Sequence, residues 1–199
     1  MERIGIAGGS GAGKSTLAYN LVDSAPDIFD VINFDDYQKL KTDANLPMVD
    51  NMINFDHPQV ILWDKLIDDL VLLEKGQILE IQTWDNRSNV DFQKHGIRIT
   101  RQIFPKKVII VDGCLSLWHP KLRALYDRKY FLDLNLDERL KRRQKFLYPE
   151  YRDRVLIPMH NEHVEPTKNY ADRVFDTASL TPNLLLTQVI DDLQQHGII

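Results

Sequence analysis

The sequence predicts an α/β fold in which a parallel sheet carries helices on both faces. Short apolar runs alternate along the chain with segments whose apolar residues recur at helical spacing, the pattern of a parallel sheet. Lys107–Val111 is apolar and β-branched at consecutive positions, as expected for a central strand buried on both faces. The 199 residues hold no internal repeat and no low-complexity linker. We therefore predict a single domain over residues 1–199.

The elements follow from local patterns taken in chain order. The expected strands are Arg3–Ala7, Val31–Phe34, Lys107–Val111, Lys129–Leu134 and Asp172–Asp176. The expected helices run over Ser15–Asp23, from His57-Pro58 to a stop at Gly76, over Asp137–Phe146, and from a cap at Thr181-Pro182 to Gly197. Asn86–Arg101 fits this alternation poorly and is interpreted as an excursion from the sheet, such as a hairpin.

The composition favours a soluble cytoplasmic protein. A content of 43% hydrophobic and 27% charged residues is ordinary for a globular chain. The net charge of -4 and a pI near 5.8 argue against a nucleic-acid binder. Cys114 is the sole cysteine, which excludes an internal disulfide. No signal peptide or membrane span is indicated, so we expect no contact with nucleic acid or membrane.

A phosphate-binding loop follows the first expected strand. GGSGAGKS, Gly8–Ser15, matches G-x-x-x-x-G-K-[ST] between a strand and a helix, which is the context that the pattern requires. Backbone N–H groups in such a loop point at phosphate oxygens, Lys14 adds a cation, and the Ser15 hydroxyl is a Mg²⁺ ligand. A plain glycine-rich turn is the weaker reading, and the glycine spacing does not suit a dinucleotide fold. The predicted nucleotide-binding residues are Gly8, Gly9, Ser10, Gly11, Ala12, Gly13, Lys14, Ser15 and Thr16.

Two adjacent acids, Asp35 and Asp36, end the second expected strand. Carboxyl ends of parallel strands share one edge of a sheet, so these acids should lie near the phosphate loop. A carboxylate there can hold the water ligands of a metal ion and accept the proton of an attacking hydroxyl. The alternative is an ordinary turn acid or helix cap, and Asp36 needs no further role.

Six motifs in order make the chain resemble a known family. The motifs are GGSGAGKST, FDDY, NFDHP, VDG, RLKRR and VEPTKNYAD. Together they are similar to the uridine kinase family, one of the P-loop kinases, which also include nicotinamide riboside kinase and phosphoribulokinase. The resemblance implies a nucleoside-kinase-like parallel sheet with a short helical lid at about 137–165. It also implies ATP as phosphate donor and Mg²⁺ as cofactor.

The resemblance assigns roles to several acids. Asp35 matches the catalytic acid of the family and also becomes a Mg²⁺ ligand. Asp56 matches the residue that binds the ribose 2′- and 3′-hydroxyls, with a cap of the helix at Pro58 as its alternative. Phe55 is placed against the base, or in the core. Asp112 takes the place of a family glutamate and is expected to bind Mg²⁺ directly or through water.

The charged segment RLKRR matches the lid arginines of the family. Arg139, Arg142 and Arg143 are therefore expected to stabilise the charge on the transferred phosphoryl group. For any single one of them a solvated helix face is an equal alternative, and which of the three contacts phosphate is left open.

The chain departs from the family pattern where the base is read. In place of Pro-x-Tyr-Asp and a nearby His, the sequence has QTWDNRSN, with Gln82, Trp84, Asp85 and Asn89 at the corresponding positions. Trp84 and Asp85 are still assigned to acceptor binding. The departure bears on uridine as the acceptor more than on the reaction type.

The predicted function is an ATP- and Mg²⁺-dependent kinase for a primary hydroxyl, with the 5′-OH of a ribonucleoside as acceptor. The alternatives are a kinase for nicotinamide riboside or another ribosyl or vitamin compound, and an inactive nucleotide-binding regulator. A GTPase switch is disfavoured because no N-K-x-D motif occurs. The partner expected is a small molecule; ATP or GTP preference and homo-oligomer formation stay open.

Overall fold

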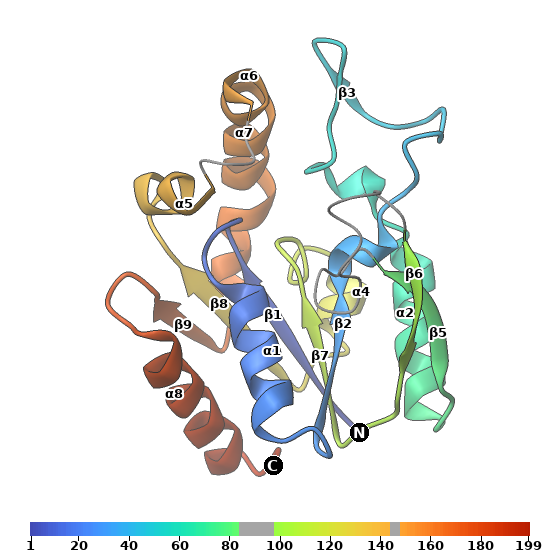
Figure 1. Cartoon of the computed structure of the whole chain (residues 1–199), viewed down its shortest axis with the longest axis vertical. Coiled ribbons are helices and arrows are strands. Elements are labelled where there is room, and N and C mark those ends of the chain that lie inside the picture. The colour runs from blue at the N-terminus through green and yellow to red at the C-terminus, as the bar shows by residue number, and fades with distance from the viewer. Residues whose placement is uncertain (84–97, 144–147) are drawn as a thin grey trace.

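A parallel five-stranded sheet forms the centre of the computed structural model, which describes residues 1–83, 98–143 and 148–199. The strand order is β2-β7-β1-β8-β9 (Figure 1). The strands are β1 Glu2–Gly8, β2 Phe29–Asn33, β7 Val108–Asp112, β8 Arg128–Asp133 and β9 Arg173–Asp176. Every neighbouring pair is parallel, so the carboxyl ends of all the strands lie at one edge.

Two hydrophobic clusters cover the two faces of this sheet. Alternate residues of a strand point to opposite faces, and β7 shows this directly. Val108 and Ile110 pack with helices α1 (Lys14–Ser24) and α8 (Pro182–Gln195). Ile109 and Val111 pack with α2 (Trp63–Glu74) and α4 (Pro120–Arg123) on the other face. Because β7 is apolar at every position before its last residue, it occupies the inside of a sheet covered on both sides.

The expected strands are all present with small shifts at their ends. The second begins at Phe29 and ends at Asn33, because Phe34–Tyr37 turns into a 3₁₀ helix. The first and last expected helices correspond to α1 and α8, and the Thr181 hydroxyl accepts the Leu184 N–H as the predicted cap. The charged helix is α5, Leu136–Arg143, which ends at the boundary of the described residues.

The expected start of the long helix at Pro58 is wrong. Pro58–Val60 form only a 3₁₀ turn, and α2 begins at Trp63. Between them Ile61 is extended and forms a bridge with Gln38, while the Trp63 indole N–H donates to the Pro58 carbonyl. Pro58 therefore starts the 3₁₀ turn and not the helix. Ile61 has an extended backbone, and from this conformation its apolar side chain packs into the core.

The sequence predicted only part of an antiparallel pair of strands that lies outside the central sheet. Strand β5, Leu79–Thr83, was not expected, and it pairs with β6, Ile99–Ile103. The predicted excursion reaches into β6, and its part before residue 98 lies outside the described residues. A partly buried ion pair between Arg101 and Asp30, 2.6 Å, joins this pair to β2.

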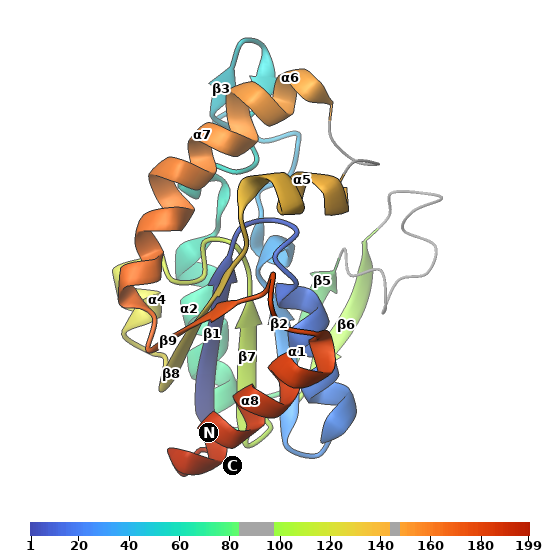
Figure 2. The ribbon, with the colours of Figure 1, turned by 90° about the vertical axis from the view of Figure 1, so that its left-hand side faces the viewer.

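A run of short helical segments lies beyond the carboxyl edge of the sheet (Figure 2). It comprises α6 Pro149–Tyr151, a π-helical turn Arg152–Leu156, α7 Ile157–Met159, a second π turn His160–Val164 and a 3₁₀ helix Glu165–Tyr170. Opposite α6 stands a small hairpin of β3, Met48–Val49, and β4, Met52–Ile53. Across the described ranges no helix has the length and apolarity that crossing a membrane requires.

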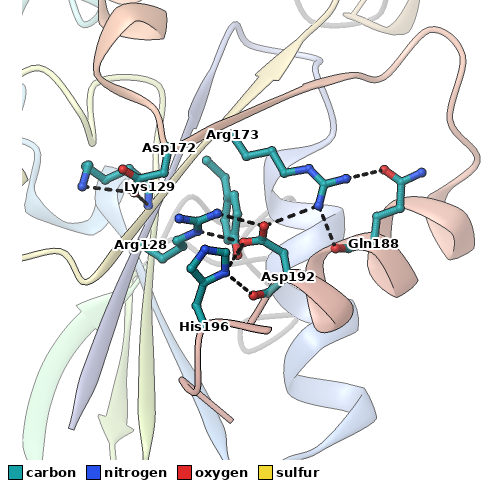
Figure 3. A network of polar contacts seen from close by, with 8 residues as sticks. Arg128, Lys129, Asp172, Arg173, Gln188, Asp192 and His196 are labelled. Atoms are coloured by element: carbon teal, nitrogen blue, oxygen red, sulfur yellow. Dashed lines mark hydrogen bonds and ion pairs between the residues drawn. The ribbon is translucent and has the colours of Figure 1, made fainter. Parts of the chain in front are cut away.

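A buried carboxylate fastens α8 to the outer strands (Figure 3). Asp192 accepts two hydrogen bonds of 2.8 Å from Arg128 and one of 2.7 Å from the Tyr130 hydroxyl. Arg173 adds an ion pair at 3.4 Å. Burial alone would raise the pKa of Asp192, but the hydrogen bonds from Arg128 and Tyr130 favour the charged carboxylate and hold its pKa below the usual value.

We predict that Asp192→Asn lowers the free energy of unfolding by about 3 kcal/mol, because it leaves the Arg128 charge without a full partner. The folded-state pKa of Asp192 is depressed, so its stabilisation is complete above the ordinary aspartate pKa of about 4 and is lost as the pH falls through the folded value. Denaturant titrations between pH 7 and pH 3 should therefore show the wild type losing its advantage at low pH. Asp191→Asn, at the exposed neighbour, is the control; equal losses in both variants would contradict this account.

Candidate active site

The phosphate loop joins the end of β1 to the start of α1. Its curl depends on glycine, because Gly11 and Gly13 have φ angles of +89° and +99°. A Cβ on Gly11 would also lie 2.9 Å from the carbonyl oxygen of Arg139, so a larger residue would push α5 away. The loop therefore brings its backbone close to both α1 and α5.

Lys14 projects from the first residue of α1 into the site and is 7% exposed. Its ammonium donates to the Gly9 carbonyl at 3.2 Å and contacts the Cys114 sulfur at 3.3 Å. Burial lowers its pKa, but Cys114, Asp112 and Asp35 outweigh this effect and the pKa lies above the usual value. Lys14 is therefore a cation fixed at the loop.

Asp35 and Asp112 face the phosphate loop because β2 and β7 are neighbours. Asn33, the last residue of β2, pairs with Asp112, the last residue of β7, so Asp35 in the turn that follows β2 comes to the same edge as Asp112. Both acids line a cavity of about 390 Å³ together with Lys14, Ser15 and Thr16. Asp35 is open to this cavity, yet the surrounding chain desolvates it and raises its pKa against the opposing charges of Lys14 and Arg143.

Asp36 lies away from the phosphate loop. Its side chain is 8% exposed, whereas that of Asp35 is exposed. The guanidinium of Arg98 donates to the backbone carbonyls of Asp36 and Gln38, and the Asp36 charge acts on it. Of the two adjacent acids, the geometry brings Asp35 to the predicted position.

A neighbouring cavity of about 220 Å³ opens on the other side of Asp35. Its polar lining includes Ser10, Asp35, Asp56, Arg139, Arg143, Tyr151 and His160. Its apolar lining includes Phe34, Phe55, Ile61, Leu115, Leu156, Met159 and Val164. Because Ser10, Asp35 and Cys114 line both cavities, the two adjoin at these residues.

Asp56 enters this second cavity from the loop between β4 and α2. Its carboxylate accepts the Tyr151 hydroxyl at 2.7 Å. Burial raises the pKa of Asp56, while Tyr151 and Arg143 act in the opposite direction. The alternative of a helix cap is wrong, because the side chain of His57 accepts the Gln59 N–H at that turn.

All three arginines of α5 reach the phosphate loop. Arg139 is buried beside Gly9 and donates to the Leu134 carbonyl at 3.0 Å, and burial lowers its pKa. Arg142 donates to the Gly11 carbonyl at 3.3 Å, and Arg143 hydrogen-bonds the Ser10 hydroxyl. Arg139 and Arg143 face the second cavity, whereas Arg142 faces the first.

Several residues of the site were not predicted from the sequence. Cys114 directly follows the VDG motif, so its position beside Lys14 could have been predicted from that motif. His160 was not separated from the other histidines; it is 8% exposed, and burial together with Arg139 and Lys14 lowers its pKa to about 4. Tyr151 lies on a short helix without any recognisable pattern.

Some predicted acceptor residues cannot be placed at the site. Trp84, Asp85 and Asn89 lie outside the described residues. Gln82, at the end of β5, is on the surface of the hairpin, where its amide donates to the Thr100 hydroxyl at 2.7 Å.

A parallel sheet with a glycine-rich loop after β1 and a lysine at the start of α1 defines a P-loop fold, the class of proteins that bind nucleoside triphosphates. The solved structures agree on this fold. A possible uridine kinase from Bacillus stearothermophilus has a TM-score of 0.61 at 18% identity, with 88% of each chain covered. The shikimate kinase from Acinetobacter baumannii has a TM-score of 0.55 at 13% identity, covering 98% of this chain and 94% of that one.

The family is shown by sequence. A model of the Phosphoribulokinase / Uridine kinase family matches residues 3–146. A uridine kinase from Chlamydia pneumoniae is 35% identical over 186 residues, covering 86% of this chain and 80% of that protein. A uridine kinase from Staphylococcus haemolyticus is 33% identical, with 85% and 84% covered. The chain belongs to the phosphoribulokinase/uridine kinase family and is a phosphotransferase with an alcohol acceptor.

We predict that Lys14→Ala reduces kcat by at least about 10²-fold, the scale for removing one preorganised charge-stabilising group. The fold should persist, since the ammonium contacts the loop and not the hydrophobic core. Phosphoryl transfer and circular dichroism would be measured together, with Lys41→Ala at an exposed position as control. A folded Lys14→Ala protein with normal kcat would contradict the assignment of the loop.

Proposed function

We propose that the protein transfers the γ-phosphate of ATP, with Mg²⁺, to the 5′-hydroxyl of a ribonucleoside. The observation that carries this proposal is the meeting of two cavities at Asp35, one on the phosphate loop and one containing Asp56. A kinase needs its donor and its acceptor on either side of the transferred group, and this arrangement supplies both. The relatives named uridine kinase support a nucleoside as acceptor.

The donor would bind along the phosphate loop. Its phosphates would meet the loop N–H groups and Lys14, as the loop geometry of this fold favours. A further cavity of about 140 Å³ continues from the loop past Thr16 and Asn20 to Pro182. Its lining is mostly apolar and includes Arg142, which suits the base of the donor.

The donor cavity also offers ligands that suit Mg²⁺. Ser15, Asp35 and Asp112 present a hydroxyl and two carboxylates to one space, and Mg²⁺ prefers such oxygens together with water and phosphate. Within the described ranges no cluster of three or more His, Cys, Asp or Glu side chains gathers as a metal site. When bound, Mg²⁺ neutralises charge on the phosphates and fixes their orientation.

Asp35 would accept the proton of the acceptor hydroxyl. It lines both cavities, and the desolvation that raises its pKa makes the carboxylate a better base. Lys14 stands on the donor side, and Arg139 and Arg143 stand on the acceptor side. Their charges would stabilise the phosphoryl group as it passes between the cavities.

The acceptor would be held by Asp56 and enclosed by apolar side chains. A carboxylate that accepts two neighbouring hydroxyls suits the 2′,3′-diol of a ribose. Phe55 lines the same cavity and offers a ring to the rest of the acceptor. A riboside other than uridine, such as nicotinamide riboside, would use the same diol contact.

The proposal is tested by an ADP-release screen with ATP-Mg²⁺ and, as acceptors, the common ribonucleosides, nicotinamide riboside and free vitamins. We expect turnover with at least one riboside and none with its 5′-deoxy analogue, because the 5′-hydroxyl is the nucleophile. The absence of turnover on every riboside, with a folded enzyme that binds ATP, would contradict the proposal and favour a regulatory nucleotide-binding protein.

We predict that Asp56→Ala raises KM for the riboside by roughly 10- to 100-fold, the size of hydrogen bonds to a charged group, with a smaller effect on kcat. The wild type should discriminate a riboside from its 2′,3′-dideoxy analogue, and the variant should lose this discrimination. KM for ATP serves as the internal control. An unchanged preference for the diol in Asp56→Ala would show that Asp56 does not bind the sugar.

A further inference from the structure

One contact joins the short helices beyond the sheet to the acceptor side of the site. Tyr151 of α6 donates its hydroxyl to the Asp56 carboxylate at 2.7 Å and accepts the Phe55 N–H at 3.2 Å. The hairpin of β3 and β4, which precedes the loop that carries Asp56, stands opposite α6 (Figure 1). The same two regions are also joined by an ion pair between Arg154 and Asp50.

The ion pair and the hydrogen bond from Tyr151 differ in strength. Arg154 and Asp50 are each more than half exposed, at 55% and 53%, so their ion pair contributes little. The Tyr151 hydroxyl instead meets a desolvated carboxylate inside the acceptor cavity. A hydrogen bond to a charged group in such a place is among the stronger ones. The hydrogen bond from Tyr151 is therefore the connection that can affect binding of the acceptor.

We propose that Tyr151 is a positioning residue for the acceptor, which holds the Asp56 carboxylate in the orientation that binds the substrate hydroxyls. The proposal rests on the proposed function, in which Asp56 binds the sugar. It adds a residue from α6 to the determinants of acceptor affinity.

The geometry explains how one hydroxyl fixes a carboxylate. Tyr151 is anchored by the backbone N–H of Phe55, the residue next to Asp56, so its oxygen cannot move independently of the loop. It donates to Oδ2 of Asp56 and thereby leaves Oδ1 for a ligand. Burial raises the pKa of the Tyr151 phenol, with the Asp56 charge adding to the effect, so the hydroxyl remains a donor at neutral pH.

Without this donor the carboxylate would lose its defined orientation. The other charges that act on Asp56 are Arg143, Asp35 and Lys14, none of which is in hydrogen-bond contact with it among the described residues. The attraction of Arg143 and the repulsion of Asp35 draw the carboxylate in no single direction. A rotating carboxylate would give up part of its affinity for the acceptor as conformational entropy.

The test is Tyr151→Phe, which keeps the ring and removes only the hydroxyl. KM for the acceptor should rise about tenfold, the size of a lost hydrogen bond to a charged group, while kcat and KM for ATP change little. Tyr148→Phe makes the same chemical change at a side chain of the same segment that is 83% exposed, and it should match the wild type. Thermal unfolding of both variants shows whether the fold is affected.

A double variant separates positioning from direct contact. In the Asp56→Ala background, Tyr151→Phe should have no further effect on KM, because the carboxylate that it orients is gone. Full additivity of the two effects would mean that Tyr151 contacts the acceptor itself and would overturn the proposal. So would an unchanged KM in Tyr151→Phe, or equal changes in KM for acceptor and ATP.

These outcomes differ from a failure of the proposed function. If Asp56→Ala raises KM and Tyr151→Phe does not, Asp56 binds the sugar without help and only the positioning role is lost. If Asp56→Ala itself leaves KM and diol preference unchanged, the sugar contact fails, and the positioning role fails with it.

Discussion

The parallel pairing of β7 with both β1 and β2 is the constraint on which the rest of the site depends. In this pairing Asp112 stands beside Ile6 of β1 and Asn33 of β2. Because parallel strands end at one edge, the phosphate loop after β1 and the acid after β2 meet around Asp112. The apolar run of β7 is buried on both faces and sets this register. A slip by one residue would turn Asp112 and the residues around it away from the loop.

The same edge concentrates charge that a folded protein ordinarily avoids. Lys14, Arg139 and Asp112 are all at least nine-tenths buried, and Asp35 and Asp56 are desolvated. Isolated charges there would cost several kcal/mol each, so they persist only as a group of opposite signs. The raised pKa of Lys14 reflects this mutual dependence, because Cys114, Asp112 and Asp35 outweigh its burial. At Asp35 burial has the larger effect, and the attraction of Lys14 and Arg143 only partly offsets the rise in its pKa. Substrate phosphates would add the negative charge that balances the lysine and the arginines of α5.

The sheet and the phosphate loop could be predicted from the sequence because local residue patterns determine both. The glycine spacing of Gly8–Ser15, the apolar run of β7 and the cap at Thr181 each specify their own conformation. The start of α2 was misplaced because Pro58 begins a 3₁₀ turn as readily as a helix, and only the bridge of Ile61 to Gln38 decides between them.

The remaining site residues depend on contacts between distant segments. Tyr151 meets Asp56 across 95 positions, and Lys14 meets Cys114 across 100. No periodicity within either segment encodes the contact of Tyr151 with Asp56, since it results from how the helical segments fold over the sheet edge. The contact of Lys14 with Cys114 follows from the pairing of β1 with β7. His160 likewise owes its low pKa to burial and to Arg139 and Lys14, which only the tertiary structure brings near.

The adjacent acids Asp35 and Asp36 offer the most direct test of this arrangement, because they are consecutive in the sequence but their side chains point in different directions. Asp35→Asn and Asp36→Asn would be compared by kcat on the best riboside and by ATP affinity under identical conditions. The account predicts a fall in kcat of about 10²–10⁴-fold for Asp35→Asn with a much smaller change in ATP binding, and a far milder effect for Asp36→Asn. A sensitive Asp36, or two variants with normal kcat, would contradict the proposed role of Asp35 as the base between the two cavities.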